Sequence, residues 1–319
     1  MPVLSISKFR IASFFSGLKK QQFRFESSEC TQLPTPVPAA QGTEPELKAR
    51  RKAEKLWLER FTYLRTIAAG SSCIVYGVRD RIEGKLLACK SFVNDSVDNM
   101  EVELDCLRSL NHPNIVRCVE SLSCEGGVYL LTEPLYKIDL QAVLVEKGKL
   151  EESEARSVMT QLMSAVSHMH RNGVVHRNIK PSKIVLKMHN NFDSLILVGF
   201  GLAALERPEE PLTTSCGSAL YVAPEVVQPN CSYDKKCDVW SIGALLFHLL
   251  TGYPPVVAKT VNELLSKIRR GKFNTSHFEW LNLSDSAKDL VSQLLTVDAS
   301  QRPTVDEIIR HPWLTKTSR

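Results

Sequence analysis

Lys90 is the first residue of the chain whose setting suggests chemistry, because it ends the apolar run Leu87-Ala88-Cys89. A lysine on an otherwise apolar strand must find a counter-charge or water, since burying an unpaired ammonium is costly. Its positive charge therefore makes Lys90 a candidate for pairing with an acidic group. The alternative is an ordinary surface lysine.

Five short motifs follow one another further along the chain. They are His176-Arg177-Asn178-Ile179-Lys180-Pro181-Ser182-Lys183, Val198-Gly199-Phe200-Gly201, Ala223-Pro224-Glu225, Asp238-Val239-Trp240-Ser241-Ile242-Gly243 and Arg302-Pro303. One such string can arise by chance. Five in this order and at these separations indicate common ancestry with proteins that share them.

These motifs resemble those of the eukaryotic protein kinases. The likeness is nearest to the calcium/calmodulin-dependent group, through His112-Pro113-Asn114-Ile115, Cys216-Gly217-Ser218 and His311-Pro312-Trp313-Leu314. It covers about residues 60–314. The resemblance implies an α+β protein with two lobes, a small β-rich lobe with one long helix and a large α-rich lobe.

The resemblance assigns several residues to the phosphates of ATP. The three glycine positions of the phosphate loop are Ala68, Gly70 and Cys73, of which only Gly70 matches, so an ordinary hairpin is the alternative. Lys90 aligns with the lysine that reaches the phosphates. Its helix partner is Glu103, with Glu101 as the second candidate, and Lys180 aligns with a lysine that touches the γ-phosphate.

The resemblance also implies an adenine pocket. Thr132 lies at the gatekeeper position, Glu133 and Leu135 lie in the hinge, and Asp139 aligns with the acid that accepts the ribose hydroxyls. The side chains that sandwich the adenine ring are Val75, Ala88 and Val185, which are simply core residues in the alternative interpretation. ATP is therefore the cofactor that the resemblance implies.

The positions that perform chemistry in the family are changed. The catalytic aspartate is replaced by Asn178, whose amide cannot act as a carboxylate base. The two metal-binding positions hold Lys183 and Gly199, and Mg²⁺ requires oxygen ligands. No catalytic set is intact, and Mg²⁺ is not expected. Lys183 is instead expected to project a third positive charge, beside Lys90 and Lys180, toward the vacated metal site.

The positions that stabilise the kinase fold are retained. His176 and Phe200 align with a hydrophobic column that links the lobes, together with Leu107. Arg177 keeps its charge, and Asp238 is expected to accept hydrogen bonds from the backbone around His176. Two further residues, Glu225 and Arg302, are expected to form a buried ion pair.

Thr214 aligns with an activation-loop threonine that is phosphorylated in many kinases. The resemblance gives Arg177 as the partner of that phosphate. Thr213 is an equal chemical candidate, and an unmodified polar loop is the alternative.

Hydrophobic periodicity predicts the elements that position these residues. Strand-like segments are expected at 62–68, 74–78, 86–93, 116–121 and 128–132, and helices at 97–110, 155–170 and 240–250. Strands thus predominate before about residue 138 and helices after it.

Composition limits the class of protein. The net charge is +5, but residues 1–25 contain five basic residues and no acid, so the remainder is nearly neutral and nucleic-acid binding is not expected. No apolar run is long enough for a transmembrane helix. The nine cysteines include no CxxC pair, which favours reduced thiols over a disulfide framework or a zinc site.

Three parts of the chain are expected. They are a disordered basic tail with a Pro-rich linker at 1–57, a kinase-like domain at 58–314 and a short tail at 315–319. The small lobe would cover 58–133 and the large lobe 134–314. A cytoplasmic location is expected. A mitochondrial one is the alternative if residues 1–25 are a transit peptide.

Three functions remain open. The preferred one is a pseudokinase that regulates or scaffolds a protein client, such as an active kinase. The second is a Ser/Thr protein kinase with weak or metal-independent transfer. The third is a kinase fold reused for another small-molecule transfer, for which no nucleophile constellation is found.

Overall fold

The computed structural model describes residues 55, 59–69, 73–92, 97–124, 127–134, 138–189, 191–207, 209–276 and 278–315. Most of the expected tail and linker at 1–57, the end of the chain at 316–319, and the site residues Gly70 and Leu135 lie outside the described residues.

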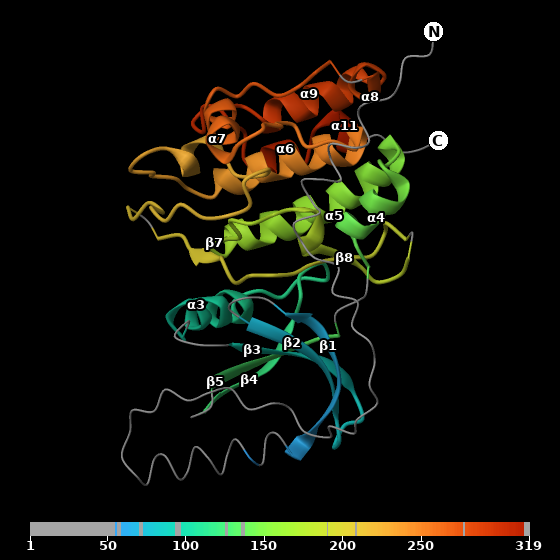
Figure 1. Cartoon of the computed structure of the whole chain (residues 1–319), viewed down its shortest axis with the longest axis vertical. Coiled ribbons are helices and arrows are strands. Elements are labelled where there is room, and N and C mark those ends of the chain that lie inside the picture. The colour runs from blue at the N-terminus through green and yellow to red at the C-terminus, as the bar shows by residue number, and fades with distance from the viewer. Residues whose placement is uncertain are drawn as a thin grey trace. The chain divides into compact units, whose positions relative to one another are not determined.

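The small lobe is built on a five-stranded antiparallel sheet with the order β1-β2-β3-β5-β4 (Figure 1). Its strands are β1 (Phe61–Ala69), β2 (Cys73–Asp80), β3 (Leu86–Phe92), β4 (Cys118–Cys124) and β5 (Gly127–Thr132). Helix α3 (Val97–Arg108) packs against β4 and β5. The helix and four of the five strands match the sequence prediction closely.

Strand β3 separates the core of the small lobe from the site. Successive side chains of a strand point to opposite faces of its sheet. Leu87 and Cys89 enter a small core with Phe61, whereas Ala88 and Lys90 share the other face. The apolar run thus fixes the direction in which Lys90 points.

The large lobe is mostly helical. Its main helices are α4 (Leu140–Lys147), α5 (Glu152–Arg171), α6 (Lys236–Thr251), α7 (Val261–Arg269) and α9 (Asp285–Leu294), with short helices α8 (Phe278–Leu281), α10 (Val305–Ile308) and α11 (Pro312–Thr315). Helix α6 is buried along nearly its whole length, as expected for a central helix. None of the helices in the described residues is long and apolar enough to cross a membrane.

Short strands and turns of the large lobe carry the site residues. They are β6 (Ile138–Asp139), β7 (Val174–Val175), the 3-10 turn η1 (Pro181–Lys183), β8 (Ile184–Leu186), β9 (Leu195–Leu197), β10 (Ala204–Leu205) and the turn η2 (Pro224–Val227). Strand β8 pairs with both β6 and β9. This pairing brings η1 and the segment after β9 side by side.

The segment between α3 and β4 is fastened to the large lobe. The amide of Val116 donates to the carbonyl of Leu197 at 3.0 Å, and the amide of Leu197 donates to the carbonyl of Asn114 at 2.8 Å. His112 Nε2 also lies 3.0 Å from Ser164 Oγ. The strand predicted from residue 116 therefore begins only at Cys118, because Val116 is bonded to β9 instead of to the small sheet.

Candidate functional site

Lys90 and Glu103 form an ion pair between β3 and α3. Lys90 Nζ lies 2.7 Å from Glu103 Oε1, and their side chains are only 16% and 4% exposed. Glu101 is exposed, so the first of the two candidate glutamates is the partner. The Lys90 ammonium also lies 4.5 Å from the centre of the Phe92 ring. Pairing and burial together fix this charge at the mouth of the site.

Val75, Ala88 and Thr132, three of the expected adenine-pocket residues, lie on neighbouring strands of the small sheet, whereas Val185 lies on β8 of a separate three-stranded sheet. Ala88 pairs with Thr132 of β5, Val75 pairs with Lys90, and Val185 lies opposite Asp139 in the pairing of β8 with β6. Ala88, Thr132 and Val185 are buried. Their role toward adenine stays a prediction.

Three other residues assigned to the nucleotide take part in local contacts. Asp139 caps helix α4 by accepting a hydrogen bond from the amide of Ala142 at 2.8 Å. Glu133 is exposed and pairs with Arg117 at 3.1 Å. Ala68 lies in β1 opposite Val75. Asp139 therefore has a structural role whether or not a ribose is bound.

Asp238 organises the loop that carries the catalytic position. It is fully buried and accepts hydrogen bonds from the amides of His176 and Arg177, each at 2.8 Å, and from His170 at 3.0 Å. Burial opposes its ionisation, but the interactions of the carboxylate with His170 and His176 together outweigh burial and lower the pKa of Asp238. The left-handed backbone of Arg177, with φ of 62°, is stabilised by these bonds.

Asn178 is held by Ser218 of the activation segment, the stretch at 199–225 that contains Thr214. Its side-chain Oδ1 accepts a hydrogen bond from the hydroxyl of Ser218 at 2.8 Å. Its backbone amide donates to His176 Nδ1 at 3.2 Å. An amide oxygen can accept a hydrogen bond but cannot take a proton at neutral pH. The Ser218 contact was not predicted, although Ser218 lies in a motif that the sequence analysis singled out.

The side chain of Lys183 packs against Gly199. The pairing of β8 with β9 brings them together, since the amide of Val198 donates to the carbonyl of Lys183 at 2.9 Å. A Cβ built on Gly199 would lie 2.6 Å from Cδ and 2.7 Å from Nζ of Lys183. The lysine thus occupies the space that the first atom of a side chain at position 199 would need.

Burial and neighbouring charges destabilise the ammonium form of Lys183. Burial lowers its pKa, and the charges of Lys180 and Lys90 lower it further, while Cys73 and Glu103 act in the opposite direction. Burial also lowers the pKa of Lys180. Lys180 and Lys90 therefore lie near enough to Lys183 to disfavour its charged form.

His176 and Phe200 stack as the resemblance predicts. Their rings lie 4.9 Å apart at 65°, and both residues are fully buried, as is Leu107 in the same core. His176 Nε2 lies 3.3 Å from the carbonyl oxygen of Val198. Burial lowers the pKa of His176 to about 4, so its ring is neutral at pH 7.

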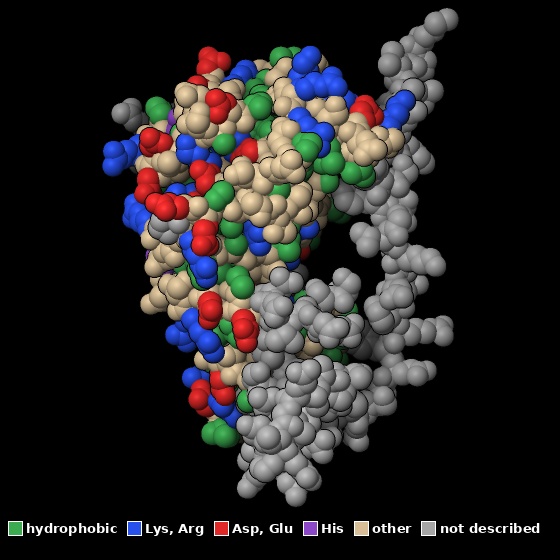
Figure 2. Space-filling model, turned by 90° about the vertical axis from the view of Figure 1, so that its left-hand side faces the viewer, with side chains coloured by type: hydrophobic (Ala, Val, Ile, Leu, Met, Phe, Trp, Pro, Cys, Tyr) green, Lys and Arg blue, Asp and Glu red, His purple; other side chains and the backbone are tan. Residues whose placement is uncertain are grey.

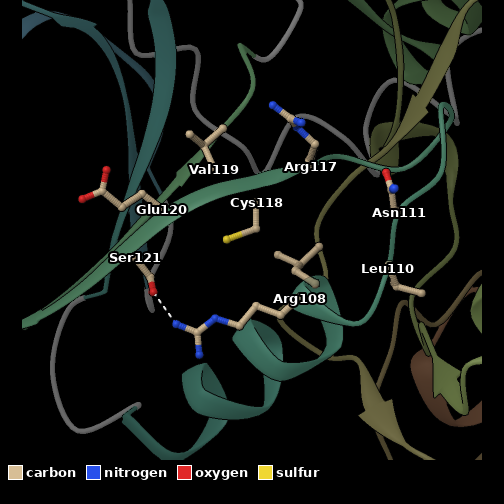
Figure 3. Close-up of a pocket in the computed structure, with 9 residues that line it drawn as sticks. Arg108, Leu110, Asn111, Arg117, Cys118, Val119, Glu120 and Ser121 are labelled. Atoms are coloured by element: carbon tan, nitrogen blue, oxygen red, sulfur yellow. Dashed lines mark hydrogen bonds between the residues drawn. The ribbon is translucent and has the colours of Figure 1, made fainter. Parts of the chain in front are cut away.

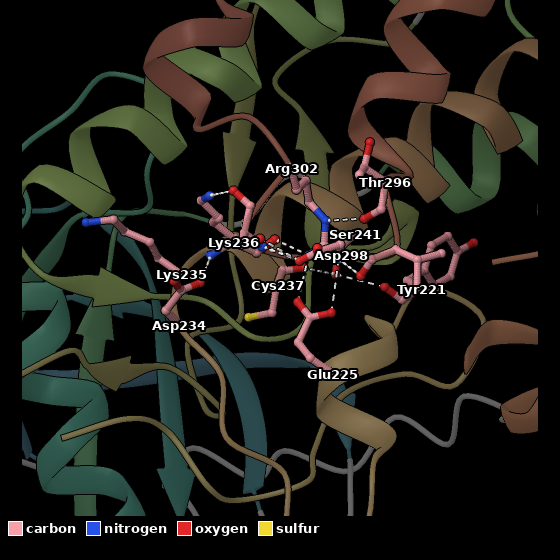
Figure 4. A network of polar contacts seen from close by, with 12 residues as sticks. Tyr221, Glu225, Asp234, Lys235, Lys236, Cys237, Ser241, Thr296, Asp298 and Arg302 are labelled. Carbon is pink, nitrogen blue, oxygen red and sulfur yellow. Dashed lines mark hydrogen bonds and ion pairs between the residues drawn. The ribbon is translucent and has the colours of Figure 1, made fainter. Parts of the chain in front are cut away.

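The expected Glu225–Arg302 ion pair anchors the end of the activation segment (Figure 4). The two guanidinium nitrogens donate to the two carboxylate oxygens at 2.6 and 3.0 Å. Arg302 also donates to the carbonyls of Thr296 and Lys236 at 2.9 and 2.8 Å. Arg302 is fully buried and fully hydrogen-bonded, as a stabilising buried charge must be.

Thr213 and Thr214 are both exposed. Arg177, the expected phosphate partner, donates through Nε to the carbonyl of Leu202 at 2.6 Å and through Nη1 to Tyr233 Oη at 3.3 Å. Tyr233 in turn donates to the carbonyl of Thr214 at 2.6 Å. Tyr233 therefore links the arginine to the threonine backbone, and no sequence motif indicated it.

A separate recess of about 520 Å³ lies between the end of α3 and β4 (Figure 3). Arg108 reaches across it and donates to Ser121 at 2.7 Å. Leu107, Leu110 and Cys118 supply apolar lining. The recess is distinct from the nucleotide site that the resemblance implies, because its lining includes none of the residues assigned to that site.

Comparison with known proteins agrees with this geometry. Residues 61–314 match the model of the protein kinase domain, and the chain belongs to the protein kinase family. Its small β-rich and large helical lobes are those of the protein-kinase fold.

The chain is 32% identical over 259 residues to myosin light chain kinase A of Dictyostelium discoideum, covering 80% of this chain and 88% of that protein. It is also 32% identical over 254 residues to the calcium-dependent protein kinase 3 of Plasmodium yoelii yoelii and of Plasmodium berghei, covering 78% of this chain. The match spans about half the length of these two Plasmodium proteins, 47% and 46%. These relatives place the chain in the calcium/calmodulin-dependent-kinase-like group.

Proposed function

We propose that this protein is a pseudokinase, which regulates or scaffolds protein-kinase signalling by binding rather than by phosphoryl transfer. The observation that carries the proposal is the joint replacement of three chemical groups within one intact framework. Asn178 stands where the family has its base, and Lys183 and Gly199 stand where it has its magnesium ligands.

The three replacements remove different contributions to catalysis. A positioned base typically contributes about 10²–10⁴ in rate, and an amide cannot replace it. In active kinases, the other contributions to phosphoryl transfer are the placement of the reactants and the neutralisation of phosphate charge by Mg²⁺. Asn178 therefore affects proton transfer, and Lys183 with Gly199 affects the neutralisation of phosphate charge.

The residues at the metal position do not fit Mg²⁺. This ion binds oxygen ligands in octahedral geometry. Gly199 offers no side chain, and the ammonium of Lys183 fills the adjoining space. The residues that fit ATP are those around Ala88 and the Lys90–Glu103 pair. When bound, ATP would bring a transferable phosphoryl group, which Asn178 cannot help to transfer.

The proposed partner is a protein client, and an active kinase is the preferred candidate. The recess beside α3 offers such a client a concave surface. On the face drawn in Figure 2, basic and acidic side chains are interspersed over the described surface, which favours a protein over a nucleic acid. The client is tested by adding the full-length protein to purified kinases of this group and measuring their activity, with a Val119→Asp variant in the recess as the comparison.

Transfer of radiolabelled phosphate from Mg-ATP to protein substrates tests the central proposal. The parent protein should incorporate no more label than a Lys90→Met variant, and Lys85→Met, at an exposed lysine, is the matched surface control. Transfer that disappears only in Lys90→Met would overturn the proposal.

The second candidate function is weak or metal-independent Ser/Thr kinase activity. The Lys90–Glu103 pair favours it, because active members of the family need this pair. The same assay in a chelator distinguishes the two functions, since only the second predicts Lys90-dependent transfer without Mg²⁺.

A further inference from the structure

The surroundings of Lys183 contain more positive than negative charge. Lys90, Lys180 and Lys183, here called the lysine cluster, contribute three ammonium groups, and Glu103 contributes one carboxylate. Within the described residues, Glu103 pairs with Lys90, while neither Lys180 nor Lys183 forms an ion pair. Burying like charges without counter-ions is unfavourable. This excess of positive charge favours the binding of an anion.

One member of the cluster occupies the family's metal position. Gly199 has φ of 84° and no side chain, and the end of Lys183 lies within 2.9 Å of where its Cβ would be. The β8–β9 pairing and the hydrogen bond from the amide of Val198 to the carbonyl of Lys183 keep Lys183 beside the residue that precedes Gly199. The positive charge at this position therefore belongs to the chain itself.

We propose that the lysine cluster binds the phosphates of a metal-free nucleotide, with a preference for a nucleoside diphosphate over a magnesium-bound triphosphate. The inference rests on the proposed function, because a working kinase would need the metal that the cluster replaces. Ammonium–phosphate contacts are charge-assisted hydrogen bonds, which are stronger than neutral ones.

Magnesium opposes binding in two ways. The ammonium of Lys183 repels a divalent cation, whose attraction to the site would otherwise come from oxygen ligands. Magnesium also neutralises the phosphate oxygens that the lysines would contact. A triphosphate holds Mg²⁺ more tightly than a diphosphate because it carries more charge. In magnesium-containing solution, the diphosphate therefore keeps more of its metal-free form.

Calorimetric titration of the full chain with ADP and with ATP, each in EDTA and in excess MgCl₂, tests the inference. Both nucleotides should bind in EDTA, and Mg²⁺ should weaken ATP more than ADP. Lys183→Gln should weaken ADP in EDTA by roughly ten- to a hundredfold, the loss of one charged hydrogen bond. Lys187→Gln, at an exposed lysine just after β8, should leave the affinity unchanged.

Several results would overturn the inference. Binding that Mg²⁺ strengthens, or that Lys183→Gln leaves unchanged, would exclude the proposed role of Lys183. Failure of both nucleotides to bind in EDTA would exclude the site as a nucleotide site, and inorganic pyrophosphate in the same titration shows whether the lysines bind phosphate at all. The pseudokinase proposal is tested separately, by the transfer assay. It stands if neither nucleotide binding nor phosphoryl transfer is observed, although the inference about the lysine cluster then fails.

Discussion

At the scale of single residues, the contact between Lys183 and Gly199 shows that the two substitutions depend on each other. Glycine adopts a positive φ without strain and leaves room for a neighbouring side chain. Lysine supplies a long side chain that fills that room. The two residues are therefore complementary in shape. Neither offers a side-chain oxygen ligand to a metal ion.

Replacing Gly199 with Asp should not by itself create a magnesium site. The new carboxylate would meet the ammonium of Lys183 and pair with it. We expect ATP with Mg²⁺ to raise the melting temperature of the Lys183→Asn/Gly199→Asp protein well above the value with ATP and chelator. The Gly199→Asp single variant should show no such magnesium-dependent difference, and an equal one would mean that Lys183 is easily displaced.

Motifs predicted the Lys90–Glu103 and Glu225–Arg302 pairs, because each residue lies at a position that the family motif defines. They could not predict that the end of Lys183 packs on Gly199, since that depends on the rotamer of a flexible side chain. The link from Arg177 through Tyr233 to Thr214 was also missed. Tyr233 lies far along the chain from Arg177, and only the folded activation segment brings them together.

At the scale of elements, the prediction was best where one face of an element is buried. The alternation in β3 and the buried length of α6 are both visible in the sequence as apolar patterns. The start of β4 was placed too early because Val116 is β-branched and apolar, as strand residues often are. The amide of Val116 donates a hydrogen bond to Leu197 of the large lobe. This contact is distant in sequence, so the local hydrophobic pattern could not predict it.

Arg302 connects η2 to the start of α6, and its loss should weaken the large lobe. Arg302→Ala would leave Glu225 largely buried without its partner, which should lower the free energy of unfolding by about 3–5 kcal/mol. Denaturant unfolding measures this. Arg171→Ala is the matched control, because the Arg171–Asp306 pair is exposed at 69% and 50% and should contribute about 1 kcal/mol or less. Equal losses in the two variants would contradict the assigned role of Arg302.

At the scale of the whole molecule, two buried histidines make stability depend on pH. Burial lowers the pKa of His176 and of His248 to about 4, from an ordinary 6.5. The unfolded chain therefore binds protons at a higher pH than the folded one, and acidification favours unfolding. The contribution of each histidine to the free energy of unfolding should be fully present above pH 6.5. It should fall by about 3 kcal/mol for each histidine between pH 6.5 and 4.

Denaturant unfolding at pH 7 and at pH 4 measures this loss. His248 Nδ1 lies 2.7 Å from Tyr221 Oη, so His248→Gln keeps a polar partner for the tyrosine and removes the titrating group. This variant should lose about 3 kcal/mol less than the parent between the two pH values. A loss equal to the parent's would show that His248 binds its proton without unfolding.

The complementary fit of Lys183 and Gly199 also bears on how this protein could change over evolutionary time. Aspartate at 199 would first be captured by Lys183, asparagine at 183 would face a position with no second ligand, and aspartate at 178 would act on phosphates without a metal. No single mutation among the three carries a catalytic advantage that selection could favour. Under the proposed function, phosphoryl transfer would therefore require more than one of these substitutions at the same time.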